Sequence, residues 1–471
     1  MQNLSKNYIN GQWVDWSGDT IDVHEAATGD VIARVANAGR QEMEQAVAAA
    51  KTAFESWSQS TVEQRLKVLE QLRAGLREHS TEIAETVCRE VGMPIKLAVP
   101  IQAGMPGKVT EAYIELLADF PFTEQTGNSE VQYTPVGVVG CITPWNYPLH
   151  QVILKIVPAI AAGCTVVLKP SEIAPGTAYI LAEILHSTGL PAGVFNLVSG
   201  EGATVGDAMI RHPDVNMVSF TGSTRTGHLV AHAAADDFKR IALEMGGKSA
   251  SVILEDADLP AAVKGTVNNC LLNSGQTCTA LTRMLVHESQ HDEACELAAA
   301  AVAKMTPGNP LEESTRLGPL ASAQQRDKVI DYIRLGMDEG ANLVAGGPQA
   351  PDGCEQGYFV KPTVFGGVDP GSRIAQEEIF GPVLCVIPYK DEAEAIRIAN
   401  GTPYGLSGAV WSGDQERAKR VAGRLRTGQV FVNGGAFNPL APFGGFGHSG
   451  IGREFGKWGL EEFLEVRSLQ L

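Results

Sequence analysis

The feature that most restricts the fold of this chain is a series of short apolar runs that alternate with helical segments between residues 136 and 254. The runs are Val136–Ile142, Cys164–Leu168, Val194–Val198, Val215–Phe220 and Ala250–Leu254. Uninterrupted apolar strands between helices indicate a parallel sheet that is covered on both faces. The expected fold class is therefore α/β, with a doubly wound, Rossmann-like sheet whose ligands bind at the carboxyl ends of the strands.

The regions on either side of this series also have regular patterns. Residues 8–14 and 31–35 are typical of short strands, and a Thr-x-x-Gln capping box at Thr61–Gln64 predicts the start of an amphipathic helix. A second alternating series runs from Leu259 to about Val432, which is long enough for a second α/β domain. The length of 471 residues agrees with two or three domains.

One polar segment, residues 122–134, fits neither series. It is β-prone and centred on the turn pair Gly127-Asn128, which predicts a two-stranded arm. A lone polar hairpin is only marginally stable in water. We therefore expect the arm to add to the sheet of another subunit in a homo-oligomer.

Composition excludes some classes of function. The chain has 37 Lys and Arg against 54 Asp and Glu, a net charge of −17, which argues against nucleic acid or an anionic membrane as the main partner. No apolar run is long enough to span a membrane, and the N-terminus lacks the apolar core of a secretory signal. Eight scattered cysteines without a C-x-x-C pair favour a reducing cytoplasm and give no support to a metal site.

Two glycine-containing turns indicate nucleotide binding. Gly200–Gly206 has the spacing G-x-G-x-x-x-G, and Phe220–Gly227 again follows a strand and opens a helix. A helix N-terminus with free N–H groups suits a pyrophosphate, although an ordinary Ser or Thr cap explains the second turn equally well. Residues 242–249 end like a phosphate-binding P-loop but lack its first glycine, so an NTPase is not expected.

A cation and a carboxylate, Lys169 and Glu172, follow the strand that ends at Leu168. A carboxylate in this position can accept hydrogen bonds from a ribose diol and repel a 2′-phosphate. The alternative is an ordinary exposed ion pair.

Three residues are candidates for the chemistry. Cys278 lies among small polar residues after a Gly-Gln turn, which suits an accessible thiol. Glu244 ends an apolar run, so its pKa could be raised enough for a general base, and the Asn146 amide could donate to an oxyanion. The alternatives are a buried core cysteine, a capping or paired carboxylate, and a turn-forming asparagine.

In this order, the motifs resemble those of the NAD(P)-dependent aldehyde dehydrogenase superfamily over essentially the whole chain. They are Pro-Trp-Asn-Tyr-Pro (144–148), Lys-Pro-Ser-Glu (169–172), Phe-Thr-Gly-Ser (220–223), Leu-Glu-Met-Gly-Gly-Lys (243–248), Gly-Gln-Thr-Cys (275–278), Glu-Glu-Ile-Phe-Gly-Pro (377–382) and Pro-Phe-Gly-Gly (442–445). Met245 replaces a commoner Leu, and Tyr147 a commoner Phe.

The resemblance implies that the enzyme oxidises an aldehyde with NAD as cofactor, NADP being the alternative. Cys278 would be the nucleophile, Glu244 the base that activates water, and the Asn146 amide with the Cys278 N–H the oxyanion donors. Lys248 would be structural or relay protons. The implied cofactor contacts are Lys169 and Glu172 at the adenosine ribose, Gly222 and Ser223 at the pyrophosphate, Glu378 and Phe380 at the nicotinamide ribose, and also Ile142, Trp145, Ser171, Gly202 and Phe220.

The resemblance also places a substrate tunnel between mostly aromatic or small residues. These are Tyr147, His150, Leu154, Thr277, Thr279, Phe437 and Phe443. Residues 430–446 contain no Lys or Arg, which favours a neutral aliphatic or aromatic aldehyde, unless a distant Arg283 or Arg453 folds in. Rival hypotheses are an acylating enzyme that uses coenzyme A, a non-catalytic protein on the same scaffold, and a cysteine hydrolase with His287 as its base.

The domain limits implied by the resemblance divide the chain into three parts. Residues 1–116 and 136–246 would form the NAD-binding domain, and residues 247–447 the catalytic domain. Residues 117–135 and 448–471 would form the oligomerisation arm, with Phe463–Leu471 as its C-terminal strand. Members of this length are usually dimers or tetramers.

Overall fold

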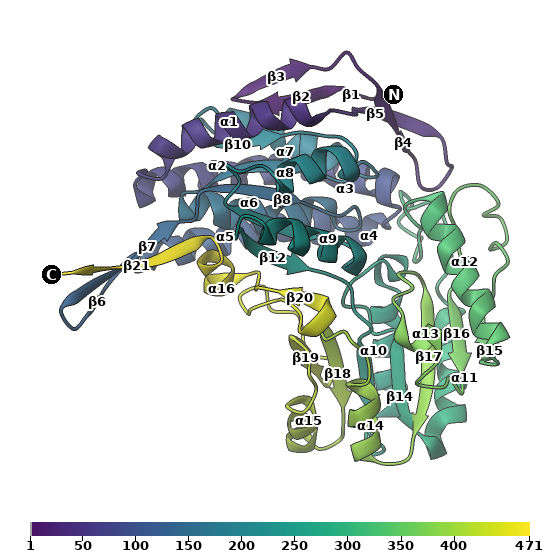
Figure 1. The fold of residues 1–471 in the computed structure, drawn as a ribbon. Helices are drawn as coiled ribbons and strands as arrows, with labels where there is room; N and C mark the ends of the chain where they lie inside the picture. The colour runs from purple at the N-terminus through teal and green to yellow at the C-terminus, as the bar shows by residue number, and fades with distance from the viewer. Residues whose placement is uncertain (1) are drawn as a thin grey trace.

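Two large β-sheets organise the chain in the computed structural model, which describes residues 2–471 (Figure 1). The first sheet has a parallel centre formed by β8 (Val138–Ile142), β9 (Thr165–Lys169), β10 (Phe195–Leu197), β11 (Met217–Thr221) and β12 (Arg240–Glu244). Its antiparallel edges are β20 (Gly450–Ile451), β2 (Lys6–Ile9) and β3 (Gln12–Asp15), in the order β20-β12-β11-β8-β9-β10-β2-β3. The predicted α/β, doubly wound arrangement is confirmed.

The order of these strands creates a topological switch point between β8 and β11. From β8 the chain builds β9 and β10 on one side, and it returns to build β11 and β12 on the other. The carboxyl ends of β8 and β11 are neighbours, because Ile142 pairs with Phe220. The loops that follow such neighbouring strands diverge and leave a crevice for a ligand.

The second sheet has six parallel strands and one antiparallel edge. They are β13 (Ala250–Ile253), β14 (Arg283–His287), β16 (Thr363–Gly366), β17 (Val383–Tyr389), β18 (Ser407–Trp411) and β19 (Gln429–Val432), with β15 (Asn342–Ala345) antiparallel. The run Ala250–Leu254, expected in the first series, therefore lies in the second sheet, and β12 is the fifth parallel strand of the first. Pairing of Ala250 with Arg283 and Gly408 decides this, and such long-range register is not visible in a local apolar pattern.

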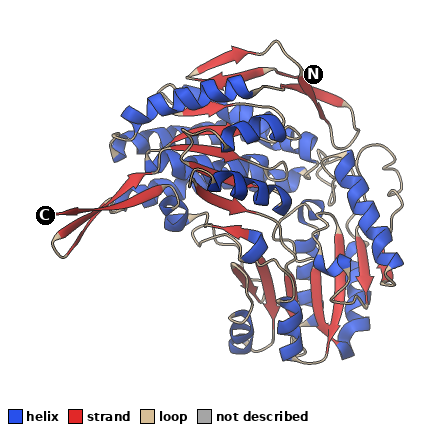
Figure 2. Cartoon of the chain, viewed as in Figure 1, coloured by secondary structure: helices blue, strands red, loops and turns tan. Residues whose placement is uncertain are grey.

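Helices cover both faces of each sheet (Figure 2). Those associated with the first sheet are α1 (Arg40–Trp57), α2 (Val62–Glu78), α3 (Ser80–Val91), α4 (Ile95–Ala98), α5 (Met105–Asp119), α6 (Pro148–Ala162), α7 (Gly176–Ser187), α8 (Asp207–Ile210), α9 (Thr224–Ala235) and α16 (Gly456–Glu461). Those of the second are α10 (Leu259–Cys270), α11 (His291–Val302), α12 (Ala323–Asp338), α13 (Arg373–Gln376), α14 (Glu392–Ala399) and α15 (Gln415–Ala422). The predicted capping box opens α2, with both Thr61–Gln64 bonds present.

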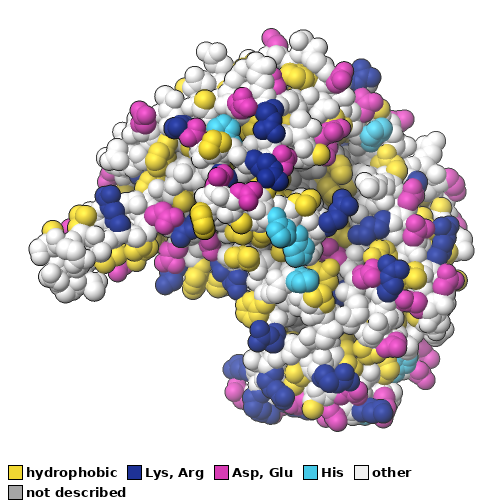
Figure 3. Space-filling view, in the orientation of Figure 1, with side chains coloured by type: hydrophobic (Ala, Val, Ile, Leu, Met, Phe, Trp, Pro, Cys, Tyr) yellow, Lys and Arg dark blue, Asp and Glu magenta, His cyan; other side chains and the backbone are white. Residues whose placement is uncertain are grey.

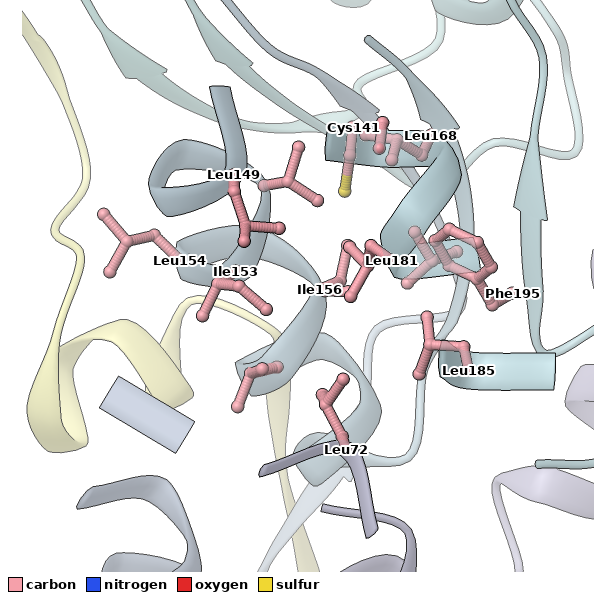
Figure 4. Packing of buried hydrophobic residues seen from close by; sticks show 14 of the residues in the cluster. Leu72, Cys141, Leu149, Ile153, Leu154, Ile156, Leu168, Leu181, Leu185 and Phe195 are labelled. Carbon is pink, nitrogen blue, oxygen red and sulfur yellow. The ribbon is translucent and has the colours of Figure 1, made fainter. Parts of the chain in front are cut away.

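Helix α6 is the most deeply buried of the helices that cover the first sheet. Figure 4 shows its side chains meeting those of α7 and of β8 to β10. Every residue of α6 except His150 is buried. A helix that is apolar on all sides must be enclosed, and this one is also capped from outside, because Arg65 Nη1 donates to the carbonyls of Ala161 and Ala162. The C-terminal end of α6 is thereby fixed, and its N-terminal end follows directly on the loop that carries Asn146.

The predicted arm is a three-stranded sheet that projects from the body (Figure 1). Its strands are β6 (Thr123–Thr126), β7 (Ser129–Pro135) and β21 (Leu464–Gln470), with β7 in the middle. Figure 3 shows apolar side chains exposed near the base of the arm, and Trp458 and Val466 are 40% and 61% exposed there. A smaller sheet of β1 (Gln2–Leu4), β4 (Thr20–His24) and β5 (Val31–Ala36) lies beside the N-terminus.

Within residues 2–471, none of the helices combines the length and the apolar character that crossing a membrane requires.

Candidate active site

A cavity of about 170 Å³ opens where the first sheet meets the second. It is bounded by the loops after β8, β11 and β12 and by segments that precede β14 and β17. Its lining residues are Pro144, Trp145, Asn146, Gln151, Thr221, Gly222, Ser223, Glu244, Met245, Gly246, Cys278, Gln325, Lys328, Glu378 and Phe380. The cavity thus joins the three candidate chemical residues to the switch-point loops of the first sheet.

The loop before Cys278 has an unusual backbone. Asn273 (φ 51°) and Ser274 (φ 57°) are left-handed, as is Gly275 (φ 75°). Asparagine tolerates this region better than most residues. Hydrogen bonds hold the turn, because the Gln276 amide donates to Asn273 O (3.2 Å) and accepts from the Ala321 N–H (2.9 Å).

Asn146 is fixed against this loop by two hydrogen bonds. Its Nδ2 donates to Gln276 O at 2.9 Å, and Asn273 Nδ2 donates to Asn146 O at 3.0 Å. Of the two N–H groups on Nδ2, one is used and one remains to donate elsewhere. Next to it, the Tyr147 hydroxyl lies 2.7 Å from Thr277 Oγ1, so the residues before Cys278 are bound to the start of α6 at two points.

The thiol of Cys278 is partly exposed, but its surroundings disfavour a thiolate. Burial raises the pKa of Cys278 far above its ordinary value, and the carboxyls of Glu244, Glu378 and Glu454 raise it further. Deprotonation of this thiol therefore requires a nearby base or an added positive charge.

Glu244 is the last residue of β12, and its carboxyl group is enclosed. Both oxygens lack a hydrogen-bond partner within the described chain. Burial, and next the nearby Glu454 carboxyl, raise the pKa of Glu244 well above its ordinary value. Glu454 in turn accepts a hydrogen bond from Lys155 Nζ at 2.9 Å, and both side chains are less than a tenth exposed. A buried acidic pair with one lysine therefore lies behind the cavity.

Another part of the cavity wall comes from the loops after β8 and β12 and from the segment before β17. Glu378 Oε1 accepts a hydrogen bond from the Gly247 N–H at 3.0 Å, and burial raises the pKa of Glu378. A Cβ at Gly246 would lie only 2.2 Å from Glu378 Oε2, so any larger residue there would displace the Glu378 carboxyl group. The rings of Trp145 and Phe380 meet edge to face at 5.4 Å.

Ser223 is the N-cap of α9, which was the alternative interpretation of this glycine turn. Its side chain accepts a hydrogen bond from the Thr226 N–H. It also lines the cavity beside Gly222, so capping and ligand contact are compatible. Phe220 differs, because it is buried in the core with its ring beneath Gly222 and does not line the cavity.

The residues expected at the adenosine ribose lie outside this cavity. Lys169 Nζ donates to Glu172 Oε2 at 3.1 Å and to Pro170 O at 3.0 Å. The Lys169 side chain is only 4% exposed, whereas that of Glu172 is 35% exposed. The Lys169–Glu172 pair is therefore not an ordinary exposed ion pair.

Two other residues expected at the cofactor lie close to this pair or to its loop. A Cβ at Gly206 would approach both Lys169 and Ile142, and Ser171 Oγ accepts a hydrogen bond from the Ile173 N–H. Gly202 faces open space.

The expected tunnel residues also lie outside the cavity lining, and most gather around a residue that the sequence did not indicate. The Phe455 ring lies 5.9 Å from His150, 5.6 Å from Phe437 and 6.0 Å from Phe443. Phe455 has φ 66°, a strained left-handed conformation for an aromatic residue. Leu154 packs in the same core cluster, and Thr279 is half-buried near Cys278.

Other site residues were also missed by the sequence analysis. Asn273, Glu454 and Lys155 act through contacts between segments far apart in the chain, and no local pattern announces them. Gln151, Gln325 and Lys328 line the cavity from helices, where a single polar residue looks like surface. The left-handed Asn273 could have been suspected from its position in the sequence Asn-Ser-Gly, which favours turns.

Two alternatives from the sequence are excluded by geometry. His287 ends β14, while Cys278 precedes the beginning of that strand, and the His287 ring interacts with Ser289 and Lys390 O. Among the described residues, His287 therefore does not pair with Cys278. Residues 245–249 connect β12 to β13 without opening a helix, so they are not a P-loop.

Comparison with known proteins agrees with this arrangement. Residues 13–469 match the model of the aldehyde dehydrogenase family. A 3-succinoylsemialdehyde-pyridine dehydrogenase of a Pseudomonas species is 50% identical over 100% of this chain and 99% of its own.

Solved structures of similar proteins give the same result. An aldehyde dehydrogenase C mutant from Pseudomonas syringae, in complex with NAD+ and octanal, is 45% identical with a TM-score of 0.98 and covers 99% of this chain and 96% of its own. A betaine aldehyde dehydrogenase from Staphylococcus aureus in complex with NAD+ is 38% identical with a TM-score of 0.96, covering 99% and 94%.

The fold and the site define an oxidoreductase built on two β-sheets that are each covered by helices. The chain belongs to the aldehyde dehydrogenase family, and it is an enzyme that oxidises aldehydes.

Proposed function

We propose that the enzyme uses NAD to oxidise a neutral aldehyde to its carboxylic acid through a thioester on Cys278. The observation that carries the proposal is the single cavity in which Cys278, Asn146 and Glu244 meet the loops of the switch point. The NAD+ complexes of the similar enzymes from Pseudomonas syringae and Staphylococcus aureus support this cofactor.

The residues present fit a dinucleotide. Gly222 and Ser223 place the N-terminus of α9 at the cavity, where its free N–H groups favour a pyrophosphate. Glu378 presents a carboxylate to a ribose diol, and Gly246 leaves the space that this carboxylate needs. Ile142, Trp145, Lys169, Ser171, Glu172, Gly202 and Phe380 complete the proposed contacts. Phe220 supports Gly222 from beneath. NAD+, when bound, accepts the hydride.

The chemistry begins when the Cys278 sulfur attacks the aldehyde carbon. The free N–H of Asn146 and the backbone N–H of Cys278 donate to the developing oxyanion. Gln276 O holds the Asn146 side chain for this, and Asn273 holds the Asn146 backbone carbonyl. Removing one such donor typically costs about 10²–10³ in rate. Loss of hydride from this thiohemiacetal leaves a thioester.

Glu244 then accepts a proton from the water that hydrolyses the thioester. Its oxygens have no protein partner within the described residues, so they can bond to that water. The raised pKa suits a general base, because it brings the carboxylate nearer to working pH. Glu454, which accepts a hydrogen bond from Lys155, contributes to this raised pKa of Glu244. Lys248, whose buried Nζ has no partner in the described chain, keeps its assignment as structural or proton-relaying.

The Lys169–Glu172 pair favours NAD over NADP. The Glu172 carboxylate would repel a 2′-phosphate, and the Lys169 ammonium that could offset it already donates to Glu172 and Pro170 O. We expect a lower KM for NAD than for NADP, and Glu172→Gln should narrow the difference. Equal KM values in the wild-type enzyme would contradict this preference.

A neutral substrate is supported by the state of the two arginines that could have bound a carboxylate. Arg283 is buried and donates to Lys248 O, Ile398 O and Ala399 O. Arg453 donates to Gly445 O and Gly452 O and lies over the Phe446 ring. The aromatic tunnel of Tyr147, His150, Phe437 and Phe443, with Thr277 and Thr279 near the thiol, suits an aliphatic or aromatic aldehyde. The octanal complex and the pyridine derivative named for the relatives agree.

The test is NADH formation by the purified enzyme with neutral and carboxylated aldehydes, with and without coenzyme A. Cys278→Ser should abolish it, and Cys354→Ser, a half-buried cysteine outside the cavity, should not. Glu244→Gln should give a single rapid burst of NADH and then stall, because the thioester is not hydrolysed. An absolute requirement for coenzyme A would instead favour the acylating enzyme, and no activity at all a non-catalytic protein.

We further propose a homodimer or homotetramer joined through the arm. The support is the projecting sheet with its exposed Val466 and nearby Trp458. The proposed domains are 1–116 with 136–246, and 247–447. The proposed arm is 117–135 with 448–471, and within it β20 pairs with β12 and α16 packs on α5 and α6. Removing residues 464–471 should shift the mass measured by light scattering to the monomer.

Eight unpaired thiols favour the cytoplasm as the location of the enzyme.

A further inference from the structure

His150 is a polar residue for which the proposed mechanism has no use. It is the only residue of α6 that is not buried, although its Nδ1 atom is enclosed. That nitrogen has no hydrogen-bond partner in the part of the chain that the structure describes. Buried polar atoms are nearly always paired in native proteins, so this nitrogen has hydrogen-bonding capacity left for a ligand.

His150 lies about one turn of α6 from a residue that contacts the segment carrying the thiol. It follows Tyr147 by three residues, and the Tyr147 hydroxyl bonds to Thr277 next to Cys278. Its ring faces Phe455, which also contacts Phe437 and Phe443. The imidazole is therefore a polar group within an otherwise aromatic wall.

The imidazole is uncharged at neutral pH. Burial lowers the pKa of His150 to about 4, and no charged side chain contributes to this shift. Its place in the first turn of α6 also opposes a positive charge. A neutral imidazole has one N–H donor and one acceptor nitrogen, which suits an uncharged polar partner better than a carboxylate.

We propose that His150 is a specificity-determining residue that hydrogen-bonds to a keto oxygen on the body of the aldehyde substrate. The preferred substrates are then aldehydes whose aromatic or aliphatic body contains an internal carbonyl group, rather than plain hydrocarbon aldehydes. This inference rests on the proposed function, because it assumes that the wall around Phe455 binds the aldehyde.

The test compares matched aldehydes that differ only in the keto group. One pair is a phenyl-substituted butanal with and without a ketone next to the ring, and the other is the corresponding pair of pentanals. For the wild-type enzyme we expect kcat/KM to be about tenfold higher for the keto member of at least one pair, the value typical of one neutral hydrogen bond. His150→Leu should bring the ratio of the two kcat/KM values in each pair to about one.

Two further measurements separate this role from a structural one. His150→Asn, which keeps a polar group, should retain part of the ratio, and His79→Leu, on the surface of the molecule, should leave it unchanged. The ratio should also stay constant between about pH 6 and pH 9, because a group with a pKa of about 4 does not titrate there.

The outcomes are distinguishable from failure of the proposed function. If wild type oxidises no aldehyde, the proposed function is wrong. If it oxidises both members of each pair equally, or if His150→Leu keeps the wild-type ratio, the function stands and the role of His150 is refuted.

Discussion

Glu90 gives the sharpest test of how burial controls charge in this enzyme. It lies on α3 and is only 2% exposed. Its two carboxyl oxygens accept from the Gly176 N–H at 3.2 and 3.1 Å, at the start of α7. Burial raises the pKa of Glu90 from 4.5 to about 8, although the Gly176 N–H opposes the shift. At neutral pH the group is therefore mostly protonated in the folded enzyme.

The sign of the effect on stability follows from the raised pKa. The contribution is fully present below about pH 4.5 and is lost progressively as pH rises to about 8, because the unfolded chain ionises first. Each unit of pH in this window costs about 1.4 kcal/mol of unfolding free energy. Between about pH 6 and pH 9 the wild-type protein should therefore lose about 2–3 kcal/mol through this one group.

Glu90→Gln should remove this loss, because an amide keeps the acceptor for Gly176 and does not ionise. The assay is thermal unfolding from pH 6 to pH 9, where 1 kcal/mol corresponds to about 2–4 °C for a domain of roughly 200 residues. The melting temperature of Glu90→Gln should rise relative to wild type as pH increases. Glu85→Gln, an exposed position on the same helix, is the matched control. If Glu90→Gln and wild type lose stability in parallel over this range, the reasoning from burial is refuted.

Three further changes test the site. Lys155→Met should destabilise the enzyme by about 3–5 kcal/mol in denaturant unfolding, because it leaves the buried Glu454 unpaired, and adding Glu454→Gln should restore most of the loss. Gly246→Ala should displace Glu378 and thereby raise the KM for NAD about tenfold or more. Gly107→Ala, where an added Cβ meets no neighbour, should leave this KM unchanged. An unchanged KM in Gly246→Ala would show that Glu378 can move freely. Asn273→Gly keeps the left-handed turn but loses the amide that holds Asn146, so kcat should fall about tenfold with KM for NAD unchanged, and a wild-type kcat would remove Asn273 from the positioning of the oxyanion donor.

The sequence predicted the elements well where burial is complete. The apolar runs became β8, β9, β10 and β11, because a strand covered on both faces must be apolar along its whole length. The pattern failed at Ala250–Leu254, which is equally apolar but belongs to the other sheet. Register between distant strands depends on contacts that a local window does not contain.

The residues of the candidate site also fall into those that the sequence could indicate and those that it could not. Cys278, Glu244 and Asn146 could be selected because each has a chemical group in a suggestive local setting. Asn273, Glu454 and Phe455 could not, since their importance lies in what they touch across the fold. Asn273 reaches Asn146 from 127 residues away, and Lys155 reaches Glu454 from 299 residues away. Positioning contacts of this kind become visible only when the segments are assembled.

The C-terminal segment shows why the arm and the site are physically linked. Between residues 443 and 455 the chain supplies Phe443 and Phe455 to the proposed tunnel wall and Glu454 to the acidic pair behind Glu244. Hydrogen bonds between the backbones of Phe443 and Glu454 close this segment on itself, and α16 and β21 of the arm follow directly. Helix α16 alone separates β21 from the stretch of chain that contains Glu454 and Phe455. If the arm joins subunits, a loss of assembly should change the pH dependence of thioester hydrolysis as well as the mass of the enzyme, since Glu454 raises the pKa of Glu244.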